Sequence, residues 1–272
     1  MSHFLTYILP CYNYADIIEE SLESIYQQNL EIPFEVICTD DNSTDTKTKE
    51  ILLKWQSKYN NFHAFFRTET GGECCANNDS INHAKGDLFF CLDTDNVLVP
   101  NSMQPLINCL DYTGCDGACF EELRYFKTIN GKRVQKDSWF FKAPNNIVDI
   151  QHIIKTGMTP ASSGNYLFTK QSYERAGGYP NGNVMGSWSF GFRQHATGSR
   201  IAILPKTFYW HRISDGGMWL SNQRKGLNNK AIIETVLEFK HIFSQETQKL
   251  LETEDCQKDF LSYCLKGKIK IK

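Results

Sequence analysis

The sequence predicts an α/β fold with a mostly parallel central sheet flanked by helices. Within the first hundred residues, an apolar strand pattern is followed by a helical pattern four times. This alternation is typical of parallel strands joined by crossover helices. Polar side chains follow three of the strands, and right-handed crossovers bring the carboxyl ends of such strands to one edge of the sheet.

The expected elements of this first half are short and clearly separated. The strands are apolar runs at residues 4–9, 34–39, 63–67 and 88–92. Apolar residues at helical spacing predict a helix over residues 17–28 and another whose apolar face contains Ile51, Leu52 and Trp55, followed by helices over residues 73–84 and 101–109. Pro105 falls within the last of these and is expected to shorten or kink it.

The second half of the chain is less regular. A strand is expected at residues 117–120, and Asn130-Gly131 predicts a hairpin turn between two further strands. The aromatic run 139–141 fits either a core or an acceptor-binding surface. We expect one α/β domain over residues 1–215, with a nucleotide-binding half (1–100) and an acceptor half (101–215), and a helical C-terminal extension over residues 216–272.

Composition narrows the class of protein. The chain has 272 residues, 41% hydrophobic and 22% charged, with a net charge of −2, so no basic field favours nucleic acid as a partner. There is no apolar run of membrane-spanning length and no secretory signal pattern at the N-terminus. Ten cysteines without a Cys-x-x-Cys pair are typical of buried thiols in a reducing compartment, so a cytoplasmic location is expected.

The basic ending 266–272 alternates lysine with apolar residues. It is interpreted as a solvated tail, with peripheral contact to anionic lipid as the alternative.

Asp93-Thr94-Asp95 follows the fourth apolar strand directly. Two carboxylates this close repel each other and stay ionised cheaply only when a cation or a ligand's hydroxyl groups satisfy them. Open α/β sheets bind ligands at the carboxyl edge of their strands. Taken alone, the pattern fits either a solvated turn or the seat of a divalent metal that carries a phosphate.

Several segments together resemble a known family, the family 2 glycosyltransferases of the GT-A fold. The segments that carry this resemblance are 8–14 (ILPCYNY), 24–28 (SIYQQ), 35–45 (EVICTDDNSTD), 78–87 and 92–96 (LDTDN). Their order and spacing are more specific than Asp-x-Asp alone. The resemblance is dense over residues 4–110 and weaker to about residue 212.

The resemblance implies roles for individual residues. Pro10, Tyr12 and Asn13 would line the nucleotide, with Tyr12 stacking on the base and Asp41 accepting a hydrogen bond from it. Asp93 would lie near the ribose and a metal-bound water and is also a candidate metal ligand, and Thr94 would contact the nucleotide. Asp95 would ligate Mn²⁺ or Mg²⁺ that bridges the diphosphate. His211 is a further candidate metal ligand, and Arg212 a candidate contact to the diphosphate.

The acceptor half departs from the family pattern. There, an acidic pair is expected at Gly186 and Ser187, and one member would act as general base on the acceptor hydroxyl. Neither residue is acidic. Another residue (His195, Asp215 or His152) could serve as the base, the substrate or metal-bound phosphate could do so, or transferase activity has been lost.

The function predicted from these observations is metal-dependent, inverting transfer of a sugar from a nucleoside-diphosphate donor, with UDP-sugar favoured, to a hydroxyl of a glycan or glycolipid. The alternative is a non-catalytic module that binds nucleotide-sugar or glycan. A nucleotidyltransferase is disfavoured because the sequence has no basic, glycine-rich triphosphate loop.

Overall fold

The computed structural model describes residues 3–213, 225 and 227–272. The strands are β1 Leu5–Cys11, β2 Phe34–Asp40, β3 Phe62–Phe66, β4 Leu88–Cys91, β5 Gly117–Ile129, β6 Lys132–Phe140, β7 Ile147–Val148, β8 Leu167–Thr169 and β9 Ile201–Arg212. The α-helices are α1 Ile18–Tyr26, α2 Thr46–Lys58, α3 Glu73–His83, α4 Met103–Thr113, α5 Ile150–Thr156, α6 Lys170–Ala176, α7 Gly186–Ala196, α9 Leu227–Glu238, α10 Gln245–Leu250, α11 Glu254–Lys258 and α12 Phe260–Leu265.

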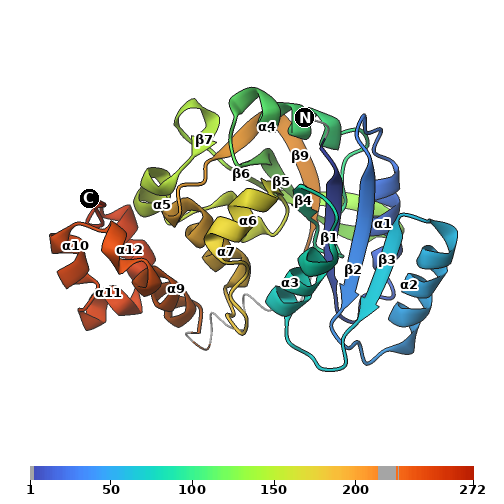
Figure 1. Cartoon of the computed structure of the whole chain (residues 1–272), viewed down its shortest axis with the longest axis horizontal. Coiled ribbons are helices and arrows are strands. Elements are labelled where there is room, and N and C mark those ends of the chain that lie inside the picture. The colour runs from blue at the N-terminus through green and yellow to red at the C-terminus, as the bar shows by residue number, and fades with distance from the viewer. Residues whose placement is uncertain (1–2, 214–224, 226) are drawn as a thin grey trace.

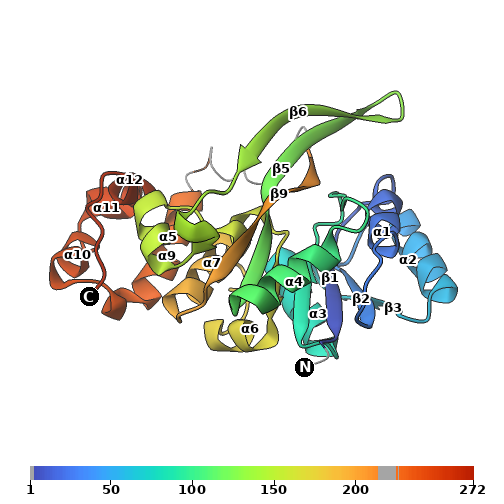
Figure 2. The ribbon, with the colours of Figure 1, turned by 90° about the horizontal axis from the view of Figure 1, so that it is seen from above.

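The strands form one mixed sheet in the order β3-β2-β1-β4-β8-β5-β9-β7, with β6 paired to β5. Strands β1 to β4 are parallel, whereas β8 runs antiparallel to both β4 and β5. Helices α3 and α6 lie on one side of the sheet and α1 lies on the other (Figures 1 and 2). The α/β prediction with flanking helices is therefore confirmed, with antiparallel pairing in the second half.

Apolar side chains from both halves fill one continuous core. The strand residues of β1 and β4 are almost completely buried, as periodicity predicts for strands covered on both faces. Pro105 falls in the first turn of α4, where a missing N–H removes no intrahelical bond, so the helix continues to Thr113.

The β5–β6 hairpin projects from the body of the molecule as an arm (Figure 2). Its turn is at Asn130-Gly131, as predicted, and both residues have positive φ, the geometry that matches strand twist in tight hairpins. The aromatic run 139–141 is only partly in the core: Phe141 is buried there, while Trp139 and Phe140 are nearly half exposed.

Helices α9 to α12 pack at the end of the molecule away from β1–β3, with α9 against α7 and α12 against α5 (Figure 1). The interpretation of the basic ending as a solvated tail is wrong for its apolar residues. Ile269 is buried, and Ile271 forms a β-bridge with Phe243. Among the described helices, none has the length and apolar character needed to cross a membrane.

Candidate active site

The loops after β1, β2 and β4 meet at one edge of the sheet. Cys11 of β1 is in register with Asp40 of β2, and Ile8 of β1 with Cys91 of β4. The Asp93–Asp95 segment therefore emerges beside the segments that follow β1 and β2, as the sequence predicts.

Asn13 connects two of these loops. Its side-chain oxygen accepts hydrogen bonds from the backbone N–H groups of Thr44 (2.8 Å) and Asp45 (3.1 Å), and its amide donates to the Thr44 hydroxyl. Thr94 is buried and its hydroxyl donates to the carbonyl oxygen of Pro10 at 3.0 Å. These polar groups hold the loops together. Tyr12, by contrast, exposes 42% of its surface at the edge.

The Asp93 carboxylate is held by two side-chain amides. Asn165 donates to its Oδ2 atom at 2.9 Å and Asn96 at 3.1 Å. Gly164 packs so closely that a Cβ atom there would lie 2.7 Å from the Asp93 oxygens. Burial, followed by the nearby charges of Glu73 and Asp95, raises the pKa of the Asp93 carboxyl well above its usual range. Asp93 is thus fixed in position within an acidic environment.

Asp95 differs from Asp93 in lacking such partners. No hydrogen bond from the side chain of another described residue reaches its carboxylate, although the group is largely buried. Burial raises the pKa of Asp95 to about 6, and Arg212 opposes this shift. A partly buried carboxylate without a hydrogen bond from another side chain is a group that a hard cation or a ligand can satisfy.

His211 lies beside this pair, and one of its two ring nitrogens contacts protein groups. Its Nδ1 atom is 3.3 Å from the Asn96 amide and 3.2 Å from the Tyr209 hydroxyl. Burial lowers the pKa of His211 to about 4, so its imidazole is neutral. Within the described part of the chain, no three acidic, histidine or cysteine side chains form a ready-made metal cluster. The structure therefore does not assemble Asp93, Asp95 and His211 as one three-ligand set.

Arg212 is also engaged by the protein. Its guanidinium donates to the backbone oxygen of Asp95 at 3.0 Å and to Thr128 at 2.8 Å, and it forms an ion pair with Glu20. It also stacks over the Phe126 ring, 4.6 Å from the ring centre. These contacts fix the Asp95 loop to β9 and leave Arg212 little freedom to follow a diphosphate.

Asp41 is saturated with protein contacts. Its carboxylate accepts hydrogen bonds from the backbone N–H groups of Gly71 (2.9 and 3.2 Å) and Gly72 (2.7 Å), and Arg67 lies 2.9 Å away. A carboxylate offers about four acceptor positions, and these contacts use that capacity. The residue is 4% exposed. The structure thus places Asp41 as the anchor of the loop before α3.

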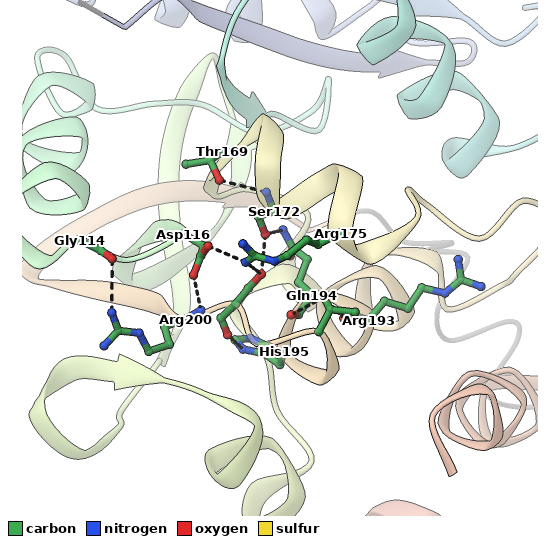
Figure 3. A network of polar contacts seen from close by, with 11 residues as sticks. Gly114, Asp116, Thr169, Ser172, Arg175, Arg193, Gln194, His195 and Arg200 are labelled. Atoms are coloured by element: carbon green, nitrogen blue, oxygen red, sulfur yellow. Dashed lines mark hydrogen bonds and ion pairs between the residues drawn. The ribbon is translucent and has the colours of Figure 1, made fainter. Parts of the chain in front are cut away.

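His195 does not lie at the site. It is 1% exposed, and its Nδ1 atom bonds the backbone oxygen of Ser199 at 2.9 Å. Figure 3 shows it within a polar network that includes Asp116, Arg175 and Gln194. Burial lowers the pKa of His195 to about 4. The sequence-based assignment of His195 as base is therefore corrected, because a solvent-excluded imidazole cannot reach an acceptor hydroxyl.

The structure does not place His152 or Asp215, the other two candidate bases, at the site. His152 lies on α5, beside the C-terminal helices, and burial lowers its pKa. Asp215 lies outside the described residues.

The structure brings one further acid to the site that sequence reasoning missed. Glu73 is the first residue of α3, and its Oε1 atom accepts a 2.6 Å hydrogen bond from the hydroxyl of Ser187, near the start of α7. Ser187 is one of the two positions where an acid was expected. Glu73 follows Gly71-Gly72 in the sequence, but nothing in that local pattern indicates that α3 and α7 begin side by side.

The fold and the acidic sheet edge define the class. A mixed sheet with flanking helices matches solved structures of the GT-A fold: Staphylococcus aureus TarS 1–349 in complex with UDP-GlcNAc has a TM-score of 0.68 and 19% identity over 98% of this chain and 72% of that one. The mannosyltransferase PcManGT from Pyrobaculum calidifontis, in complex with GDP-Man and Mn²⁺, has a TM-score of 0.64 and 18% identity over 96% of this chain and 72% of that one.

The family can be stated more closely. The model of glycosyl transferase family 2 matches residues 6–177, so the chain belongs to that family. A poly(ribitol-phosphate) beta-glucosyltransferase from Bacillus spizizenii is 32% identical over 54% of this chain and 22% of the relative. A poly-beta-1,6-N-acetyl-D-glucosamine synthase from Staphylococcus aureus is 25% identical over 81% of this chain and 53% of the relative. The chain thus spans about a fifth to a half of these relatives' lengths.

Proposed function

We propose that the protein transfers a sugar from a nucleoside-diphosphate donor, with UDP-sugar favoured, to a hydroxyl group of a glycan or glycolipid acceptor. The observation that carries this proposal is Asp95, a desolvated carboxylate without a side-chain partner at the edge where β1, β2 and β4 end. Membership of glycosyl transferase family 2 and the sugar-polymer relatives support the same reading.

The residues present fit a divalent cation. Mg²⁺ and Mn²⁺ are commonly held by one or two carboxylates, with substrate phosphates and water completing the shell, so a preformed three-ligand cluster is not required. We propose Asp95 as the metal ligand. When bound, Mn²⁺ or Mg²⁺ would neutralise charge on the departing diphosphate. His211 is proposed as a further ligand through its Nε2 atom, because Asn96 and Tyr209 contact only its Nδ1 atom.

The nucleotide would be positioned by residues around Asp95. Tyr12, exposed at the end of β1, is proposed to stack on the base. Asp93, held by Asn96 and Asn165, is proposed to accept hydrogen bonds from the ribose hydroxyls. Pro10, Asn13 and Thr94 support this surface through their loop contacts. Asp41 and Arg212 are not proposed as direct donor contacts, because protein groups engage both side chains.

One observation favours a second function. Gly186 and Ser187 supply no acid, so a module that binds nucleotide-sugar without turning it over is the competing reading. Release of nucleoside diphosphate from UDP-glucose, UDP-GlcNAc and GDP-mannose, each with Mn²⁺ or Mg²⁺, separates the two. We expect metal-dependent release from a UDP-sugar. Binding of UDP with no release from any donor, alone or with glycan acceptors, would favour the binding module.

A further inference from the structure

Helices α3 and α7 begin in direct contact with each other. A Cβ atom at Gly186 would lie 2.0 Å from the Sγ atom of Cys74, closer than non-bonded atoms approach. An acidic side chain at the first position of α7 would therefore require the Cys74 thiol to move. The space that the expected acid would need belongs to α3.

The next residue of α7 turns toward α3 as well. Ser187 donates its hydroxyl hydrogen bond to Glu73 Oε1 at 2.6 Å, which leaves Oε2 as a free acceptor among the hydrogen bonds of the described residues. Glu73 as a residue is partly exposed. A carboxylate thus lies at the start of α7 after all, supplied by the neighbouring helix.

The loop before Glu73 is attached to the sheet edge of the proposed donor site, because the Asp41 carboxylate accepts a 2.7 Å hydrogen bond from the backbone N–H of Gly72. The negative charge of Glu73 raises the pKa of the Asp93 carboxyl, as the largest cause after burial, and it also raises the pKa of Asp95. Burial, followed by the charges of Asp95, Asp93 and Glu73, raises the pKa of the Tyr14 hydroxyl in the loop after β1. The residue before Glu73 is thus bonded to the sheet edge, and Glu73 itself is bonded to the first turn of α7. It is not the third member of a metal cluster, since the described residues contain none.

We propose that Glu73 is the general base of the sugar transfer and that Ser187 is its positioning residue; this inference rests on the proposed function. In the step, the acceptor O–H proton passes to Glu73 Oε2 while the acceptor oxygen bonds to the anomeric carbon. The bond from that carbon to the diphosphate oxygen breaks, and its electron pair leaves with the nucleoside diphosphate.

The surroundings suit this role. Burial raises the pKa of Glu73, and the Ser187 hydrogen bond opposes the shift. A carboxylate with a raised pKa binds a proton more strongly and is a better base near neutral pH. The Asp41 carboxylate accepts hydrogen bonds from the backbone N–H groups of Gly71 and Gly72, and these anchor the loop that precedes Glu73.

The test is Glu73→Gln, which keeps the side chain's size and removes its basicity. With the most active donor and water as acceptor, we expect kcat for nucleoside diphosphate release to fall by about 10²- to 10⁴-fold, the range for loss of a general base. The Kd for UDP with Mn²⁺ should change by less than about threefold, a small free-energy change. Glu69→Gln, an exposed glutamate in the same loop, is the matched control and should keep the wild-type kcat.

A relocation experiment distinguishes a base from a merely structural residue. Glu73→Ala should lose turnover, and adding Ser187→Asp, which returns an acid to α7, should recover kcat by about tenfold or more, a gain of about 1.4 kcal/mol in transition-state stabilisation. A purely structural role for Glu73 does not predict this rescue.

The outcomes are separable. If wild-type protein releases nucleoside diphosphate but Glu73→Gln does so at a similar kcat, Glu73 is not the base. If Glu73→Gln loses UDP affinity in parallel with turnover, its role is in donor binding and the inference is overturned. If the wild type itself turns over no donor, the proposed function fails first and the inference fails with it.

Discussion

The Asp41 carboxylate accepts a 2.7 Å hydrogen bond from the backbone N–H of Gly72, thirty-one residues further along the chain. This contact joins the end of β2 to the start of α3, and Gly71 and Arg67 reinforce it. Gly72 has a φ of +84°, a conformation that favours glycine and needs such an anchor. The position of Glu73, the next residue, depends on this joint.

Asp41→Asn should therefore disturb the position of Glu73, the proposed general base, more than it disturbs nucleotide binding. Asparagine has one acceptor oxygen, so at least one loop N–H loses its partner and the Arg67 ion pair weakens. We expect the free energy of unfolding to fall by about 1–3 kcal/mol, the cost of unsatisfied buried groups. We also expect kcat to fall with little change in Kd for UDP, measured by denaturation, nucleoside diphosphate release and calorimetry.

Asp45→Ala is the control for destabilisation alone. Asp45 caps α2 by accepting a 2.7 Å hydrogen bond from the Thr48 N–H, and losing such a cap costs about 1 kcal/mol. It should lower stability without lowering kcat. A variant at Asp41 that lost its preference for UDP over GDP while keeping kcat would restore the sequence-based assignment of Asp41 to the base.

Asp95→Asn tests the metal assignment. The amide removes the negative charge that we propose holds Mn²⁺, and charge-assisted contacts of this kind contribute about 1.5–3 kcal/mol. We expect the gain in UDP affinity on adding Mn²⁺ to fall by roughly 10- to 100-fold. Calorimetry with and without Mn²⁺ measures this, with Asp255→Asn, on the exposed surface of α11, as control. An unchanged Mn²⁺ effect would refute Asp95 as the ligand.

Much of the fold and half of the site follow from local sequence. The short apolar run before Asp93 predicts a buried strand, and the rule for crossover connections then places its end beside those of β1 and β2. The hairpin at Asn130-Gly131 follows from the same kind of short-range signal. These features depend on residues close together in the chain, where pattern and geometry are directly linked.

The rest depends on packing between distant elements, which periodicity does not reveal. His195 is a polar residue, yet α7 places it in the interior, where its Nδ1 atom is hydrogen-bonded to the backbone oxygen of Ser199. Asp41 fits a ligand-binding motif, yet the glycine loop uses its acceptor capacity. Glu73 gains significance only because α7 starts against α3, and no feature of residues 71–75 indicates that contact.

The buried His195 predicts a pH-dependent stability. Its pKa is lowered by burial from 6.5 to about 4, so the unfolded chain binds a proton that the folded protein does not. The stability from this group is complete above pH 6.5 and falls as pH drops toward 4, by about 3 kcal/mol over that window. His195→Asn, which keeps a donor but cannot titrate, should reduce the pH slope near pH 5 by about 1 kcal/mol per unit.

Urea denaturation of both proteins between pH 4.5 and 8 measures this slope. His211, whose pKa is lowered to a similar value, keeps its own contribution, so the variant should retain a residual pH dependence. His241→Asn, an exposed site, controls for losing a histidine. Equal slopes for wild type and His195→Asn would show that His195 does not stay neutral in the fold.

The close start of α3 and α7 predicts a pair of substitutions that compensate each other. Gly186→Ala places a methyl group 2.0 Å from Cys74 Sγ, and overpacking of this kind costs about 1–3 kcal/mol. Cys74→Ala removes the sulfur and leaves the new methyl 3.8 Å from the Cys74 Cβ, an ordinary contact. The double variant should therefore be more stable than Gly186→Ala alone, and alanine's higher helix propensity adds to this gain.

A double-mutant cycle measured by thermal and urea unfolding quantifies the coupling, which we expect at about 1–3 kcal/mol in favour of the double variant. The cycle also bears on the site, because Gly186→Ala should displace Ser187 from Glu73 and lower kcat, while the double variant should recover it. Additive effects of the two substitutions on stability would mean that α3 and α7 do not begin in contact. Glu73 would then not lie within hydrogen-bond distance of Ser187 at the start of α7.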